Sequence, residues 1–322
     1  MALLDSIEEI QKYVPVRHDF PVEDLAIYIP KAARKFIEPF AGNLATELED
    51  IAGGENTAIK NKARDLLSEA LCSFSFFIGM PVLSVQISGG GFHVQSTADH
   101  SNADTFAKNE MSRAFLREAH EALDKLLLLL DANASLFTSY TEDLQNQGKE
   151  LLVQNVATFQ KWYNLHHSRQ TFLALQPAMR QVEDQFLYSW LCADFIEHIK
   201  TTTPADNVLE VKTALQKAMV HLTVAKAVTE GQFIINENGI YLKFDRLPHE
   251  ATATNVNLKI NDFLLRTAKA REEAGLEYLK AARRIIEAHP DDFTQCDGVV
   301  ILPKPEGNGG STIVFNDRIL AL

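Results

Sequence analysis

Two stretches of the chain alternate apolar and polar residues on either side of a glycine-containing turn. The first, QISGGGFHVQ, spans residues 86–95, and the second, QFIINENGIYLKF, spans residues 232–244. Alternation with a period of two predicts β-strands, and a glycine turn between two such runs predicts a β-hairpin. Placing Gly91 on Gly239 aligns the two hairpins at an offset of 148 residues (239 minus 91).

The segments that flank the hairpins carry apolar residues at helical spacing and match one another in the same order. Residues 63–80 lie over residues 211–228 at this offset, so that Leu67 matches Leu215. The other matches are IQKYVPVRH at 10–18 with FQKWYNLHH at 159–167, ARKFIEPF at 33–40 with MRQVEDQF at 179–186, and residues 109–127 with residues 261–286. An ordered set of matches predicts an internal duplication. The alternative is two helical stretches that share only their amphipathic pattern.

Each repeat is expected to contain four helices, with the hairpin between the third and the fourth. The first helix has a capping-box start, Ser6 with Glu9 or Ser139 with Glu142, and ends near Tyr13 or Tyr163. The second starts near a proline, a residue that the first turn of a helix tolerates. The remaining bounds expected are 30–51 and 177–200 for the second helix, 58–77 and 207–228 for the third, and 104–130 and 255–289 for the fourth.

The predicted fold is therefore mainly α, with two tandem related helical-bundle units and an extended strand-like C-terminal tail. Unit 1 is expected over residues 1–138 with its hairpin at 82–96, and unit 2 over residues 139–290 with its hairpin at 231–245. Residues 291–322 form the predicted C-terminal arm. Two β-rich runs, 299–302 and 311–315, flank a Pro/Gly linker within it.

Charge and composition restrict the class of protein. The 322 residues carry a formal net charge of −12, and the Lys and Arg residues are dispersed, so we expect no binding of nucleic acid through bulk charge. The longest apolar run, residues 126–130, is too short to span a bilayer, and the acidic N-terminus is unlike a signal peptide, so we expect no membrane contact. The three cysteines include no Cys-x-x-Cys pair and predict buried, reduced thiols in a reducing compartment.

No sequence motif identifies a reaction. Asp194 and His198 share one helix face at i, i+4 and could contact a metal, but further ligands are not evident, and we expect a solvated face. GNGGST at 307–312 lacks the lysine of a phosphate-binding loop and predicts a flexible connector. We therefore expect no catalytic residues, no metal and no cofactor. An enzyme with scattered site residues remains an alternative.

The hairpins and the tail are the candidate interaction elements. The outer edges of a two-stranded hairpin carry unpaired N–H and C=O groups that can accept a further strand. The predicted contact residues, with a subunit or a partner, are Gly89, Gly90, Gly91, Phe92, Asn238, Gly239, Tyr241, Ile313, Val314 and Phe315. Two alternatives stay open: the hairpins are covered by their own helices, and the tail strand pairs within its own domain.

The segments ARDLLSEALCSFSFF, QISGGGFHV, FIINENGIYL and REEAGLEYLKAARRII, with the strand-like tail, resemble the head-to-tail connectors (adaptors, head-completion proteins) of tailed bacteriophages, in a duplicated form. The resemblance implies a structural virion protein that forms a homo-oligomeric ring between the portal and tail proteins. It implies that DNA passes through the lumen without sequence-specific binding, and that the ring is assembled in the bacterial cytoplasm. The doubled length departs from that family and leaves the stoichiometry open. The alternative function is a cytosolic bacterial interaction or scaffold protein with no phage role.

Overall fold

The computed structural model describes residues 2–49, 56–83, 85–88, 91–94, 105–189, 191–201, 206–228, 233–236, 239–242 and 262–293. These residues divide into two compact units, one ending at Gln145 and the other beginning at Asn146. Residues 139–145 belong to unit 1 because the Ser139 backbone N–H donates to Glu47 at 2.7 Å and Tyr140 is buried in the unit 1 core. The boundary between units therefore lies seven residues after the expected one.

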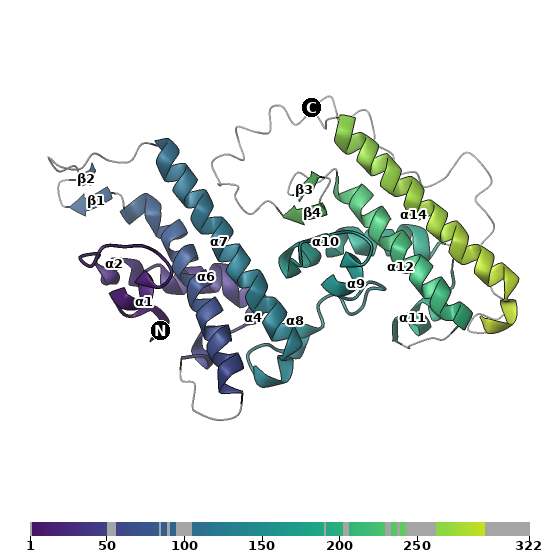
Figure 1. The fold of residues 1–322 in the computed structure, drawn as a ribbon, viewed down its shortest axis with the longest axis horizontal. Coiled ribbons are helices and arrows are strands. Elements are labelled where there is room, and N and C mark those ends of the chain that lie inside the picture. Colours follow the sequence, from purple (N-terminus) through teal and green to yellow (C-terminus); the bar gives the residue numbers. More distant parts are fainter. Residues whose placement is uncertain are drawn as a thin grey trace. The chain divides into compact units, whose positions relative to one another are not determined.

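Unit 1 consists of short helices packed around one long pair, α6 and α7 (Figure 1). Its elements are η1 (Ala2–Leu4), α1 (Ile7–Gln11), α2 (Val22–Ala26), α3 (Ile29–Ala32), the π-helix η2 (Ala33–Ile37), α4 (Glu38–Ala41), α5 (Leu44–Glu47), α6 (Thr57–Leu83), β1 (Val85–Ser88), β2 (Gly91–Val94), α7 (Thr105–Ala132), η3 (Ala134–Leu136) and α8 (Glu142–Gln145).

Unit 2 repeats this plan, with α12 and α14 as its long pair (Figure 1). Its elements are α9 (Val156–Gln160), α10 (Arg169–Val182), the π-helix η4 (Glu183–Leu187), α11 (Ala193–Thr201), α12 (Asp206–Ala227), β3 (Phe233–Asn236), β4 (Gly239–Leu242), α14 (Asp262–Ala288) and η5 (Pro290–Asp292). The mainly helical, duplicated architecture with one hairpin in each unit is confirmed. The predicted arm at residues 291–322 starts too early, because Asp291 and Asp292 complete η5 and Phe293 is buried in the unit 2 core. The rest of the predicted arm, from residue 294 onward, lies outside the described residues.

The two hairpins have the same register. β1 pairs antiparallel with β2 from Val85↔Val94 to Ser88↔Gly91, and β3 pairs with β4 from Phe233↔Leu242 to Asn236↔Gly239. Adding 148 to each residue number of the first hairpin gives its counterpart in the second. The offset inferred from the glycine turns therefore holds for the backbone pairing as well.

The predicted third and fourth helices are confirmed, whereas the second helix is wrong in both units. In place of the one helix expected over residues 30–51, residues 29–47 form α3, η2, α4 and α5, and residues 50 and 51 lie outside the described residues. Pro39 has no N–H to continue the α-helical hydrogen-bond ladder, and Gly42 reverses the chain with a φ of +59°. In unit 2, α10 begins at Arg169, eight residues before Pro177, and ends in the π-helix.

The first helix is short in both units. In unit 1 the Ser6 side chain caps α1 by accepting from the Glu9 N–H at 3.3 Å, as predicted. In unit 2 the expected helix from Ser139 to Tyr163 is wrong, because turns and extended residues separate the four residues of α8 from α9. The cap of α9 is Asn155, whose side chain accepts from the Thr158 N–H at 2.8 Å.

The π-helices correct the alignment of the repeats. They begin at Ala33 and Glu183, an offset of 150, which places Phe36 on Phe186. The sequence match of residues 33–40 with 179–186 is therefore wrong by four residues. A shift of four is about one helical turn, so it preserves the amphipathic pattern and cannot be detected from it.

Two cysteine environments differ from each other. Cys72 is a free thiol in the unit 1 core, and burial raises its pKa to about 12. Cys192 is disulfide-bonded, so the prediction of a reduced thiol is wrong at that position.

The helix α6 is long and apolar enough to cross a membrane by length and composition. Its most apolar 18-residue window is 56% buried inside the protein, as in the core helix of a soluble protein, which passes the same test. The long apolar run of α7 also faces the core, since Leu126, Leu127 and Leu130 are buried at helical spacing. The absence of membrane contact stays a prediction.

Candidate functional site

The structure locates four of the ten predicted contact residues. Gly91 and Phe92 lie in β2, and Gly239 and Tyr241 lie in β4. The others, Gly89, Gly90, Asn238, Ile313, Val314 and Phe315, lie outside the described residues. The described part of each hairpin is therefore its backbone pairing, together with the surface of the unit next to it.

The second hairpin is anchored to its own unit. The Ile240 backbone N–H donates to the Asn164 carbonyl oxygen at 3.0 Å, and Ile240 is 0% exposed. Gly239 has a φ of +148°, and a Cβ atom there would lie 2.4 Å from the same oxygen. Gly239 therefore faces its own unit, and not a partner. This agrees with the alternative that a hairpin is covered by its own unit. Glycine is required at this position because no other residue has room for its Cβ atom.

A row of cationic and aromatic side chains lies where α12 and α14 face the segment after α9. The Lys217 ammonium group lies 4.7 Å from the ring centroid of Trp162 and 5.3 Å from that of Tyr278. Tyr278 in turn stacks on His221, with ring centroids 5.6 Å apart and an interplanar angle of 10°. Cation–π and stacking contacts of this kind hold the segment before Asn164 against the long helix pair.

The histidine at the end of this row is buried and neutral. Burial, and then the charge of Arg271, lower the pKa of His221 to about 4. Arg271 lies over the Tyr163 ring, 4.9 Å from its centroid. Tyr163 precedes Asn164, whose carbonyl oxygen accepts from Ile240 and so forms the strand anchor of the second hairpin. Among the described residues His221 Nδ1 has no hydrogen-bond partner, so protonation of the ring would place an uncompensated charge in the core.

Unit 1 carries an open apolar groove. It has a volume of about 570 Å³ and lies between the segment of residues 13–16 and the adjoining ends of α6 and α7. Its wall contains four aromatic rings, those of Tyr13, Phe20, Phe76 and Phe115. The ring centroid of Phe76 lies 5.5 Å from that of Phe20 and 5.3 Å from that of Phe115. The one charged residue in its lining is Glu118. Such a volume and lining suit an apolar peptide or ligand.

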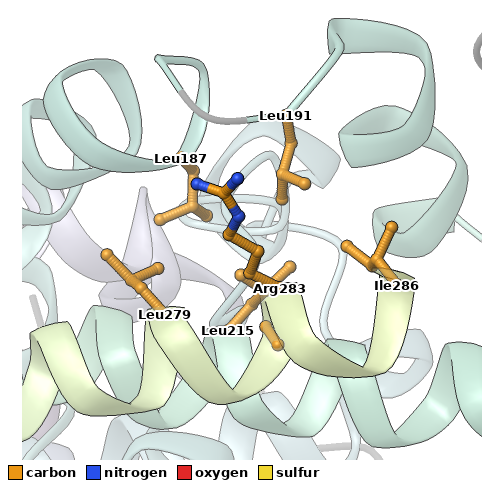
Figure 2. Close-up of a pocket in the computed structure, with 7 residues that line it drawn as sticks. Leu187, Leu191, Leu215, Leu279, Arg283 and Ile286 are labelled. Atoms are coloured by element: carbon orange, nitrogen blue, oxygen red, sulfur yellow. The ribbon is translucent and has the colours of Figure 1, made fainter. Parts of the chain in front are cut away.

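The pocket of unit 2 shown in Figure 2 is a seam in the core. It offers only about 10 Å³, little more than the space of one water molecule. Figure 2 shows the Arg283 side chain crossing this seam toward Leu187 and Leu191, and Arg283 Nε donates to Glu287 at 2.6 Å. The seam therefore has no room for a ligand.

A buried ionic cluster, which we call the Lys200 cluster, joins η4 to α11 in unit 2. Lys200 Nζ lies 3.0 Å from Glu183 and 3.1 Å from both Glu197 and the Tyr188 hydroxyl. Glu183 also accepts from the Leu152 N–H at 2.6 Å. Burial by itself would lower the pKa of Lys200, but hydrogen bonds with Tyr188 and Glu183 raise it well above its usual value, while burial raises the pKa of Glu183. Because each charged group of the cluster has a partner of opposite charge or a hydrogen-bond partner, the cluster fixes the path of the chain between η4 and α11.

The described residues contain no group of three or more His, Cys, Asp or Glu side chains that could hold a metal ion. Asp194, one of the two candidates from the sequence, is exposed on α11. Among the described residues, the hairpin edges and the unit 1 groove are candidate contact surfaces.

The sequence did not reveal the groove. Its walls come from residues as far apart in the sequence as Val14, Met80 and Met111. In addition, apolar side chains at helical spacing predict a core-facing stripe, so they do not indicate a groove. One signal was present: Phe106 and Met111 lie near the start of α7, outside the stripe that faces the core, and both are exposed.

Comparison with known proteins agrees with the duplication. The sequence model described as "Family of unknown function (DUF6712)" matches residues 36–150 and again residues 175–295. Each match covers one hairpin and the long helix pair on either side of it. No curated protein and no solved structure matches the chain. With nearly three quarters of its length covered by these two matches, the chain belongs to the DUF6712 family and contains its domain twice in tandem.

Proposed function

We propose that this protein is a non-enzymatic structural virion protein, a subunit of the connector ring that joins the portal to the tail in a tailed bacteriophage. The observation that carries this proposal is the tandem pair of helical units, each with a hairpin whose strands pair only with each other among the described residues. Such hairpins offer open edges to neighbouring subunits.

The two hairpins contribute differently. One outer edge of the second hairpin is already occupied in part, because the Ile240 N–H bonds to Asn164. The first hairpin, with Gly91 and Phe92 in β2, is therefore the better candidate for contact between subunits or with the portal and tail proteins.

The charge of the chain supports passage of DNA without retention. With a net charge of −12, a ring lined by this protein would repel the phosphate backbone and release DNA easily. The protein would assemble in the bacterial cytoplasm and remain in the virion, and no cofactor is required for such a role.

Electron microscopy of negatively stained protein, together with mass photometry, tests the proposal. The purified chain is examined alone and after mixing with the portal protein of the same phage. Closed rings in either sample are the expected result. A monomer or dimer in both samples would contradict the proposal and favour the second candidate, a cytosolic interaction protein that binds a partner peptide in the unit 1 groove.

A pair of variants in β2 tests the role of the first hairpin. Phe92→Asp and His93→Asp introduce the same charge at neighbouring positions of β2, and neighbouring strand positions belong to opposite faces of a sheet. We expect Phe92→Asp to reduce the ring fraction at least about tenfold, since it buries an unpaired charge in the contact. His93→Asp is the matched control and should assemble normally. Equal assembly of the two variants would exclude Phe92 from the interface.

A further inference from the structure

The duplication allows the unit 1 groove to be compared with the same place in unit 2. The short helices α1 and α9 align with Ile10 on Phe159, an offset of 149, and both residues are fully buried. At this offset Pro15 corresponds to Asn164. In unit 2 the Asn164 carbonyl binds β4, so the segment after α9 is covered by an extended strand with an apolar side chain, Ile240.

In unit 1 the corresponding segment forms one wall of the open groove. Tyr13, Val14, Pro15 and Val16 line it, and Pro15 is exposed. The same structural position is thus covered by a strand in unit 2 and borders about 570 Å³ of open space in unit 1. The repeat therefore indicates which kind of segment the groove accommodates: an extended backbone with apolar side chains.

The rim of the groove extends this apolar surface. Met111 lines the groove and is 48% exposed, and Phe106 is 73% exposed about one and a half turns away on α7. Val82, one residue from the end of α6, is also exposed. An apolar surface of this kind, with Glu118 as its single charged lining residue, favours an uncharged apolar occupant.

The sequence of the chain contains such a segment. Residues 311–315, STIVF, are β-branched or aromatic apart from one serine, carry no charge, and follow the Pro/Gly linker. The 17 residues from 294 to 310 can span up to about 56 Å when extended, which exceeds the length of about 40 Å of the 27-residue α14. The tether is therefore long enough to leave unit 2 and reach a neighbouring molecule.

We propose that the unit 1 groove of one subunit receives residues 311–315 of a second copy as an extended segment, in the way that unit 2 holds its own β4. The assignment rests on the proposed function, since it requires subunits side by side. It gives the tail a specific receptor, and it accounts for the difference between the described parts of the two units at this position, which is open in unit 1 and covered in unit 2.

Site-specific photocrosslinking of the full chain tests the proposal. A benzoylphenylalanine at position 315 is activated in an equimolar mixture of ordinary and ¹⁵N-labelled protein, and crosslinked peptides are identified by mass spectrometry. The expected product joins position 315 to residues 13–16 or 111–115 and contains one light and one heavy peptide in about half of the cases. Crosslinks that join residues of a single chain, or that join position 315 to other surfaces, would overturn the proposal. The absence of any crosslink from position 315 would overturn it as well. In a second variant the benzoylphenylalanine is placed at position 92. Crosslinks from position 92 to residues 13–16 or 111–115 would also overturn the proposal, because they would show that the first hairpin fills the groove.

A charge placed in the groove supplies the control. Met111→Glu is compared with Leu209→Glu, because the two apolar residues have nearly the same exposure, 48% and 46%, and Leu209 belongs to unit 2 and does not line the groove. We expect Met111→Glu to reduce the intermolecular crosslink about tenfold or more and Leu209→Glu to leave it unchanged.

Electron microscopy of the same samples separates the two proposals. Rings without groove crosslinks would overturn the groove assignment and leave the proposed function standing. Groove crosslinks between two copies without rings, even with the portal protein present, would contradict the connector role and leave the assignment standing.

Discussion

The Ile240 backbone N–H and the Asn164 carbonyl oxygen, 3.0 Å apart, join the second hairpin to the segment that follows α9. This bond brings together residues 76 positions apart in the sequence (240 minus 164). It places a residue of a two-stranded sheet in the core of a helical unit, which gives the hairpin the support that an isolated hairpin lacks. The second hairpin is therefore held by its own unit.

Gly239→Ala should destabilise unit 2. The substitution places a Cβ atom 2.4 Å from the Asn164 oxygen at a φ of +148°, so either the strand or the loop must move. We expect a loss of about 2–3 kcal/mol of unfolding free energy, measured by urea denaturation. The control is Gly79→Ala in α6, where the new Cβ atom meets only the side chains of Leu83 and Tyr28 at 3.0 Å. A loss at Gly79 as large as that at Gly239 would argue against the strand anchor.

Protonation of His221 should make stability fall in mild acid. Its pKa is about 4 in the folded protein and near 6.5 when unfolded, so the unfolded chain binds a proton first as the pH falls. Stability should therefore be full above about pH 6.5 and decline toward pH 4, by at most about 3 kcal/mol.

His221→Phe, which retains an aromatic ring next to Tyr278, should flatten this dependence between pH 7.5 and pH 5. The exposed His289→Phe should leave it unchanged. A slope that survives in His221→Phe would assign the acid sensitivity to other groups.

Lys200→Met should leave Glu183 buried without its cation. Because burial already raises the pKa of Glu183, the variant should favour the protonated carboxyl, and its stability should be lost as the pH rises through that elevated pKa. We expect a deficit of about 3–5 kcal/mol at pH 7.5 that shrinks in acid, measured by thermal or urea unfolding.

The double variant Glu183→Gln/Lys200→Met tests the cause of that deficit. It removes both charges and keeps a side-chain oxygen for the Leu152 N–H. Most of the stability at pH 7.5 should return. If the double variant is as unstable as the single one, packing and not charge dominates the Lys200 cluster.

Glu47→Ala should loosen the last segment of unit 1. The Glu47 carboxylate accepts from the Thr138 N–H at 3.0 Å and the Ser139 N–H at 2.7 Å. Although burial opposes it, these bonds lower the pKa of Glu47, so their contribution is present above about pH 4.5 and is lost as the pH falls. We expect a cost of about 1.5–3 kcal/mol at pH 7 and faster amide exchange at residues 138 and 139. Glu23→Ala, at an exposed site in α2, should change neither quantity.

The features that depend on local patterns could be predicted from the amino-acid sequence. Period-two alternation around a glycine turn placed both hairpins in the same register, and apolar spacing placed the long helices α6, α7, α12 and α14. The duplication followed because the two copies repeat those patterns in the same order, and the two matches to one family agree with it.

Only the tertiary structure decided the features that depend on contacts between distant residues. Four features each involve segments that are separated in the sequence. They are the breaks at the two π-helices, the partners of Lys200, the groove beside Pro15 and the inward position of Gly239. Amphipathic periodicity is unchanged by a shift of one helical turn, and it does not say which apolar residue meets which. Those choices are made when the segments pack, because burial and hydrogen bonding then select one arrangement among many with the same pattern.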